Sequence, residues 1–161
     1  VGLGVLLGLA DPSADLIALY RHATHLLKTY WQAGVTLSFP RIKPQMGGFQ
    51  ALHPVDESML AQAIFALRIC LPAVPLLLST REAEAVRNGL AGIGVSKMSV
   101  ASKTTVGGYS DTAEASTEQF SISDERSIDA FCAMLREKGL EPVFKNYDAI
   151  YREPTVYATR S

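Results

Sequence analysis

The chain has 161 residues, of which 48% are hydrophobic, 19% charged and 8% aromatic, and its formal net charge at pH 7 is −1. This length is typical of one domain, and the composition is that of a soluble globular protein rather than a disordered or fibrous one. The balanced charge favours neither nucleic acid nor an anionic membrane as partner, so we expect a small molecule or another protein.

The chain begins with an apolar, glycine-containing run at residues 1–9. This run is shorter than the roughly 20 residues that cross a membrane, and it has no basic segment before it. Because alternation disappears when both faces of a strand are covered, the run predicts a buried parallel strand. Asp11 as N-cap and Pro12 at the first helical position then predict a helix, whose apolar stripe runs from Leu16 to Tyr30.

Three further strand and helix pairs follow in the same order. The expected strands are Val35–Phe39, Pro75–Ser79 and Val95–Ala101, with a possible short final strand at Pro142–Lys145. The expected helices run from the N-cap Asp56 to Pro72, with a stripe that includes Cys70, from about Glu82 to Leu90, and from about Ser127 to Lys138. Two polar loops, 41–53 and 102–123, separate these elements, and loops as long as the second are often functional.

This alternation predicts right-handed βαβ units and a parallel α/β sheet. A (β/α)8 barrel has about 250 residues, so four βα units predict the half of such a barrel. The chain also starts inside a strand at Val1, without an initiator methionine, as expected of a piece of a longer protein.

Cysteines and histidines give no sign of a metal site. Cys70 and Cys132 lie far apart in expected helices, which favours a reduced, cytoplasmic setting. His22 and His25 are three residues apart on a helix and could share a metal, but a solvated or packed helix face is the simpler interpretation. Tyr30–Trp31 is expected to pack against a neighbouring element.

Ligands of parallel α/β folds bind beyond the carboxyl ends of the strands, where this sequence is rich in donors. The two arginines there, Arg41 and Arg81, carry planar forks that suit a carboxylate. Alternatively, Arg81 forms a surface ion pair with Glu82 or Glu84. The hydroxyls at these strand ends belong to Ser79, Thr80, Ser99, Ser102 and Thr104. No nucleophile–histidine pair, Walker loop or metal-spaced cluster is visible in the sequence.

A series of motifs, in order, resembles the C-terminal half of the radical S-adenosylmethionine tyrosine lyases. The motifs are Gly2–Asp11, Tyr30–Gln32, Ser38–Pro44 with Gly47–Gly48, Leu78–Glu82, Ser102–Thr104 with Gly107–Tyr109, Gln119–Phe120 and Asp124–Arg126. The resemblance covers residues 1–148 and implies the C-terminal half of a radical-SAM (β/α)8 barrel, in the region shared by biotin and thiamine synthesis enzymes. Residues 149–161 are expected to be a tail.

The resemblance also implies a reaction. In this family a [4Fe-4S] cluster cleaves S-adenosylmethionine to a 5′-deoxyadenosyl radical, which abstracts hydrogen from tyrosine. The Cα–Cβ bond then breaks to give p-cresol and dehydroglycine, which supplies the thiazole ring of thiamine together with the thiazole synthase system. An amino-acid substrate needs its carboxylate held, and we expect Arg81, at the end of a strand, to bind it.

The other site residues follow from the same resemblance. Substrate-binding helpers of Arg81 are expected at Ser79, Ser99 and Ser102. Cofactor-binding residues are expected at Gly4, Gly8, Phe39 and Arg41.

One departure from the family limits these expectations. The Cys-x3-Cys-x2-Cys cluster motif of the family lies in the first half of the barrel and has no counterpart here, so we expect this chain alone to bind no metal cluster and to be inactive. The other branch of the family, a hydrogenase maturase, carries a further cysteine motif where this chain has Lys145–Asp148. The thiamine branch is therefore favoured over the maturase branch. A non-catalytic binding or assembly module is the alternative from a different class, since an open barrel edge favours homodimers.

Overall fold

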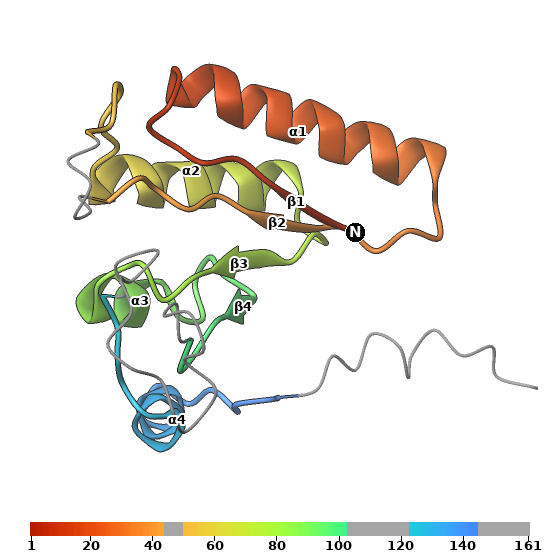
Figure 1. The fold of residues 1–161 in the computed structure, drawn as a ribbon. Helices are drawn as coiled ribbons and strands as arrows, with labels where there is room; N and C mark the ends of the chain where they lie inside the picture. The colour runs from red at the N-terminus through yellow and green to blue at the C-terminus, as the bar shows by residue number, and fades with distance from the viewer. Residues whose placement is uncertain (44–49, 103–122, 145–161) are drawn as a thin grey trace, which may run out of the picture.

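The computed structural model describes residues 1–43, 50–102 and 123–144. Within these ranges strands and helices alternate along the chain (Figure 1). They are β1 (Gly2–Gly4), α1 (Pro12–Thr29), β2 (Thr36–Ser38), α2 (Glu57–Cys70), β3 (Leu76–Leu78), α3 (Glu84–Leu90), β4 (Lys97–Met98) and α4 (Ile128–Glu137).

The strands form one parallel sheet in the order β1-β2-β3-β4, which confirms the predicted α/β architecture. Each strand is shorter than its apolar run. In the first run the ladder ends at Gly4, although Leu7 still forms a parallel bridge with Arg41. Gly8 then turns the chain with a φ of 113°, a conformation that favours glycine.

Side-chain caps start three of the helices. Asp11 accepts a hydrogen bond from the Ser13 amide at 2.8 Å, and Asp56 accepts one from the Met59 amide at 2.7 Å. Ser127 caps α4 in the same way. Because caps satisfy amides that have no partner within the helix, they fix the first turn locally and confirm the predicted helix starts.

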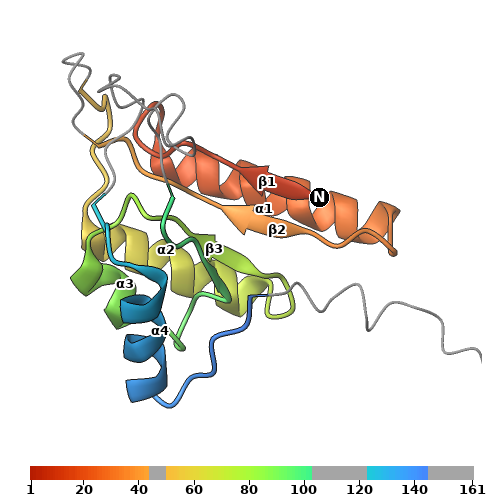
Figure 2. The ribbon, with the colours of Figure 1, turned by 60° about the horizontal axis from the view of Figure 1, so that its bottom comes forward.

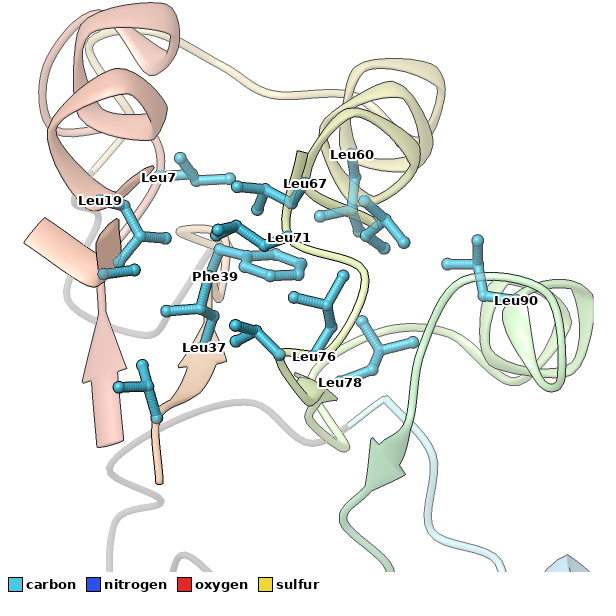
Figure 3. Close-up of a cluster of buried hydrophobic side chains, with 14 residues drawn as sticks. Leu7, Leu19, Leu37, Phe39, Leu60, Leu67, Leu71, Leu76, Leu78 and Leu90 are labelled. Atoms are coloured by element: carbon cyan, nitrogen blue, oxygen red, sulfur yellow. The ribbon is translucent and has the colours of Figure 1, made fainter. Parts of the chain in front are cut away.

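The core lies between one face of the sheet and the helices α1, α2 and α3 (Figure 3). Leu76 and Leu78 point from β3 toward these helices. The buried partners include Leu19 of α1, Leu37 of β2, Leu60, Ile64 and Leu67 of α2, and Leu90 of α3. In Figure 2, α3 and α4 lie side by side at the β4 end of the sheet, where Arg87 of α3 stacks on Phe131 of α4.

The opposite side of the sheet carries small and polar residues. Since Leu76 and Leu78 face the helices, Leu77 faces the other way, and its register partners in β2 and β4 are Ser38 and Lys97. Gly4 of β1 pairs with Ser38 and completes this row. We call the row Gly4, Ser38, Leu77 and Lys97 the inner face, because it corresponds to the inside of a barrel.

The amino ends of β3 and β4 are tied to α2 by Arg68. Its guanidinium donates to the carbonyls of Pro72 and Val74, both at 3.0 Å, and to the Gly94 carbonyl at 3.1 Å. It also donates to the Ser96 hydroxyl at 2.6 Å. Residues at the amino ends of barrel strands stabilise the fold, whereas those at the carboxyl ends carry the chemistry. Arg68 therefore has a structural role.

Gly94 is expected to tolerate no side chain. A Cβ at this position would lie 2.6 Å from Cγ2 of the core residue Ile64, whereas a Cβ on Gly89 of α3 would meet nothing within 4 Å. We expect Gly94→Ala to lower the free energy of unfolding by about 1–3 kcal/mol through overpacking. Gly89→Ala should raise it by about 0.5–1 kcal/mol. Urea unfolding of both variants tests this, and equal effects would contradict the packing of α2 against Gly94.

Three expectations about individual elements are wrong. Pro142–Lys145 was expected to form a strand, but residues 142–144 form none and Phe144 is 68% exposed; Lys145 lies outside the described residues. Trp31 is 82% exposed instead of packed, because α1 ends at Thr29 and the next residues belong to the turn into β2. Cys70 is exposed at the end of α2 rather than on its buried stripe.

Candidate functional site

The carboxyl ends of β2, β3 and β4 meet at one edge, because the strands are parallel and adjacent. β2 leads to Arg41, β3 leads to Ser79–Glu82, and β4 leads to Ser99–Ser102. The Ser99 amide donates to the Leu78 carbonyl at 3.0 Å, so the segment after β4 stays beside the end of β3. The structure thus brings the predicted donors to a common edge.

Arg41 and Glu82 form a buried ion pair between the ends of β2 and β3. Arg41 Nε donates to Glu82 Oε1 at 3.0 Å, and Arg41 Nη2 pairs with Oε2, while Nη1 donates to the Val55 carbonyl at 2.8 Å. Lys43 Nζ lies 3.4 Å from the same carboxylate. Both faces of the Arg41 fork are therefore used within the chain. Through these contacts Arg41 anchors the loop that carries Val55.

A second cluster of charges joins α3 to the segment before α4, and Arg87 and Asp124 are its buried members. Arg87 Nε lies 3.2 Å from Oδ2 of Asp124, and Arg87 Nη2 donates to the Ser99 carbonyl. Arg126 donates to the two Asp124 oxygens at 2.9 and 2.6 Å and lies 3.3 Å from Oε1 of Glu84. We call Glu84, Arg87, Asp124 and Arg126 the α3–α4 charge cluster.

Arg81 stands between these two networks. On one side, the Thr80 carbonyl accepts the amides of Ser123 at 3.0 Å and Asp124 at 3.2 Å. On the other side, Glu82 is held by Arg41, and the Arg81 amide itself donates to Ser79 Oγ at 3.4 Å. The backbone of Arg81 is thus fixed on both sides, as required of a group that must be placed before its ligand arrives.

The side chain of Arg81 is half-buried at this edge. Burial lowers the pKa of Arg81, and the nearby charge of Glu82 opposes that shift. Of the two carboxylates that the sequence offered as surface partners, Glu82 also pairs with Arg41, and Glu84 pairs with Arg126. A partly desolvated guanidinium interacts strongly with an anion, so the position suits carboxylate binding.

The predicted serines follow the carboxyl ends of β3 and β4, and Ser79 accepts the Arg81 amide. Ser79 and Ser99 are half-buried and directly follow β3 and β4. Ser102 is also half-buried and follows Ala101, whose φ of 50° is uncommon for a residue with a Cβ. Of the other motif residues, Thr104 and Gly107–Tyr109 lie outside the described residues.

The residues expected to hold a cofactor differ in what they expose. Gly4 is exposed on the inner face, and a Cβ there would lie 3.0 Å from the Ser38 carbonyl oxygen. Gly8 is buried, and its Cβ position is 3.1 Å from the side chain of Ala51. Phe39 is 2% exposed and belongs to the core. The backbone and the side chain of Phe39 are therefore both buried within the chain.

Metal-binding groups do not gather in the described part of the chain. No set of three His, Cys, Asp or Glu side chains there is placed to hold an ion. His22 and His25 are exposed on α1, Cys70 is exposed, and Cys132 is buried in α4. In the same ranges no helix is long and apolar enough to cross a bilayer.

Sequence reasoning missed the roles of Glu82 and Arg87. Glu82 was weighed only as a surface partner of Arg81, although it is 1% exposed. Arg87 is 0% exposed and drew no attention. The available signal was its place in α3, between Val86 and Leu90, three residues after Glu84.

Acid is expected to weaken both networks. Burial opposes the charge of Glu82, but the hydrogen bonds and charges of Arg41 and Lys43 outweigh it and lower its pKa. The hydrogen bond from Arg126 lowers the pKa of Asp124, against the effect of burial. A lowered pKa means that the stabilisation is complete above the unfolded-state values of about 4 and is lost as the pH falls through the folded-state values.

Urea unfolding between pH 7 and pH 3 measures this loss. We expect the free energy of unfolding to fall below about pH 4, and Glu82→Gln to flatten part of that slope while lowering stability at pH 7. A Glu82→Gln slope equal to that of the wild type would show that Glu82 does not titrate as described.

Comparison with known proteins gives consistent matches. Residues 38–141 match the biotin and thiamin synthesis associated domain. The chain is 39% identical over 150 residues to 2-iminoacetate synthase of Escherichia coli (strain K12) and 37% identical over 150 residues to that of Salmonella typhimurium. Each match covers 92% of this chain and 40% of the enzyme, so the chain spans about two fifths of the length of these curated relatives.

Solved structures agree with the fold. A crystal structure of HydG, a maturase of the [FeFe]-hydrogenase, superposes with a TM-score of 0.82 at 32% identity, over 94% of this chain and 33% of that chain. HydG from Carboxydothermus hydrogenoformans gives a TM-score of 0.78 at 34% identity, over 94% and 34% of the two chains.

Proposed function

Since this chain belongs to the family of biotin and thiamin synthesis associated domains, we propose that it is the C-terminal half-barrel of a radical S-adenosylmethionine enzyme that cleaves tyrosine. The products are p-cresol and 2-iminoacetate. The similarity to 2-iminoacetate synthases over 92% of the chain supports this proposal. The observation that carries it is the clamped Thr80–Arg81–Glu82 turn, which holds a guanidinium at the carboxyl ends of the strands.

Arg81 is proposed to bind the tyrosine carboxylate. Its planar fork can donate two parallel hydrogen bonds to a carboxylate, and the flanking networks hold the residues on both sides of it. Hydroxyls of Ser79, Ser99 and Ser102 are proposed to hold the amino group and the remaining carboxylate lone pairs. Together they orient the Cα–Cβ bond, while the chemistry that breaks it comes from S-adenosylmethionine and a [4Fe-4S] cluster when these are bound in the complete enzyme.

The residues of this chain fit S-adenosylmethionine but not the [4Fe-4S] cluster. Gly4 is exposed on the inner face, where a backbone without a side chain permits close approach of S-adenosylmethionine. Gly8, Phe39 and Arg41 are buried in the described chain and are proposed to form the wall of the same side. The cluster does not fit, because Cys70 and Cys132 are the only cysteines and belong to separate helices. Its ligands must come from outside this chain.

For the use of the product 2-iminoacetate, the thiamine branch of the family is favoured over the hydrogenase maturase branch. The two curated relatives, at 39% and 37% identity, are 2-iminoacetate synthases, whereas the two maturase structures are 32% and 34% identical. We therefore propose that 2-iminoacetate feeds thiazole formation in the cytoplasm, through a thiazole synthase system. Maturation of a hydrogenase is the alternative.

We also propose domain limits and an assembly state. The half-barrel is placed at residues 1–148 and a tail at residues 149–161, the latter outside the described residues. β1 is at the edge of the described sheet, so its backbone groups favour homodimers of the isolated chain. A native mass of one chain in solution would contradict the dimer.

An anaerobic assay tests the proposed reaction. The complete enzyme, with its cluster reconstituted, is supplied with tyrosine and S-adenosylmethionine, and p-cresol and 5′-deoxyadenosine are measured. Both products are expected. Deoxyadenosine without p-cresol would keep a radical enzyme but exclude tyrosine cleavage, and the absence of both from a cluster-loaded sample would favour a non-catalytic module.

A further inference from the structure

Arg87 carries a charge at a position with no exposed surface. Its exposed fraction is 0%, and burying a guanidinium is costly unless the charge is paired and hydrogen-bonded. The fold nevertheless keeps arginine there, on the short helix α3 that directly follows the Arg81 turn. The contacts of Arg87 show what this charge is used for.

The guanidinium of Arg87 joins three separate segments. Its Nη2 donates to the Ser99 carbonyl just after β4, and its Nε pairs with Asp124 at 3.2 Å. Its Cζ atom lies 4.8 Å from the centre of the Phe131 ring of α4. Arg87 therefore contacts the end of β4, the segment before α4, and α4.

Asp124 links Arg87 to the end of β3. Its amide donates to the Thr80 carbonyl at 3.2 Å, directly before Arg81, while its carboxylate pairs with Arg87 and Arg126. The Cζ atom of Arg126 lies 5.2 Å from the centre of the same Phe131 ring, and Arg126 also pairs with Glu84. The two cations thus pack against one aromatic ring and share the buried carboxylate of Asp124, while Glu84 pairs with Arg126 from the exposed side.

We propose that Arg87 is a positioning residue that holds Ser99 and the Thr80–Arg81 turn in fixed register at the tyrosine site, an inference that rests on the function proposed above. It acts directly on the Ser99 carbonyl and, through Asp124, on the Thr80 carbonyl. Lysine cannot replace it, because an ammonium group lacks the rigid fork that reaches two acceptors and stacks on a ring. Small displacements of such groups cost catalysis heavily, by about 100-fold for 1 Å.

Arg68 provides a matched control at the opposite end of the sheet. It donates to the carbonyls of Pro72, Val74 and Gly94 and to Ser96, so it also ties helix to strands, but at the amino ends. Arg87→Met and Arg68→Met each remove an arginine that joins loops to the sheet. Arg87→Lys and Asp124→Asn are milder changes in the same link and serve if Arg87→Met does not fold.

Amide hydrogen exchange in the complete enzyme is the first measurement. Arg87→Met should speed exchange of the Ser123 and Asp124 amides, which donate to Thr80, by about tenfold or more relative to the Ser96 amide, which donates to Leu76. Arg68→Met should show the reverse preference. Uniform acceleration in both variants would overturn the local role of Arg87.

Tyrosine binding in the same variants is the second measurement. Arg87→Met and Arg87→Lys should raise the dissociation constant for tyrosine about tenfold, whereas Arg68→Met, at an equal loss of thermal stability, should change it less than about twofold. If the wild type binds tyrosine and the Arg87 variants bind it with the same dissociation constant, the positioning role is overturned. If the wild type binds no tyrosine, the proposed function fails, and the exchange pattern alone decides whether Arg87 holds these turns.

Discussion

Replacing Arg81 by alanine in the complete enzyme is expected to weaken tyrosine binding by about 10- to 150-fold. Hydrogen bonds to charged groups contribute about 1.5–3 kcal/mol each, and the alanine variant leaves the substrate carboxylate without its guanidinium. The dissociation constant measured by equilibrium binding should rise, and the KM for p-cresol formation should rise with it. The dissociation constant of Arg81→Lys should lie between those of the wild type and Arg81→Ala, since lysine keeps the charge and loses the planar fork.

Arg136→Ala is the matched control for this experiment. Arg136 is exposed on α4, so its removal deletes the same side chain away from the strand ends. Tyrosine affinity should be unaffected in this variant. An Arg81→Ala enzyme with the affinity of the wild type would remove Arg81 from the substrate site, even if p-cresol is still formed.

Truncating Glu82 is expected to cause the largest loss of stability in the chain. Glu82→Ala leaves Arg41, which is 5% exposed, without its bidentate partner. Removing one member of a buried ion pair costs about 3–5 kcal/mol, because the remaining charge stays desolvated. Urea unfolding should show this loss, whereas Glu141→Ala, at an exposed position after α4, should stay within about 0.5 kcal/mol of the wild type.

A double variant distinguishes the loss of the ion pair from the cost of leaving one buried charge unpaired. Arg41→Met combined with Glu82→Leu replaces both charges by apolar groups, and such replacements are often neutral or stabilising. The double variant should therefore be more stable than Glu82→Ala. A Glu82→Ala cost below about 1 kcal/mol would show that the Arg41 charge finds another partner or reaches water.

The helix starts could be predicted from the sequence because caps are local. The Asp11 and Asp56 side chains bond to amides two and three residues ahead, so the signal and the structure it produces share one short segment. Parallel strands followed from the same alternation of patterns. Strand length could not be predicted in this way, because a ladder depends on both strands and ends where they stop pairing, as after Gly4 and Ser38.

The candidate site could be predicted in outline and not in its contacts. The edge that carries Arg81 followed from the parallel topology alone. The pairing of Arg41 with Glu82 joins residues 41 positions apart, and no short motif encodes it. For the same reason Arg87 escaped notice, since its partners Asp124 and Ser99 lie in other βα units. Trp31 shows the opposite failure, in which a helix pattern was extended beyond the end of the helix.

The order of the strands has a consequence for how the chain folds during synthesis. Gly2 pairs with Thr36, Leu37 with Leu76, and Leu77 with Lys97, so every ladder joins neighbours in the chain. Within the described ranges each of these pairings closes one loop that contains one helix. The sheet can thus grow one βα unit at a time as the chain emerges from the ribosome, and its contact order stays low for a β-containing fold.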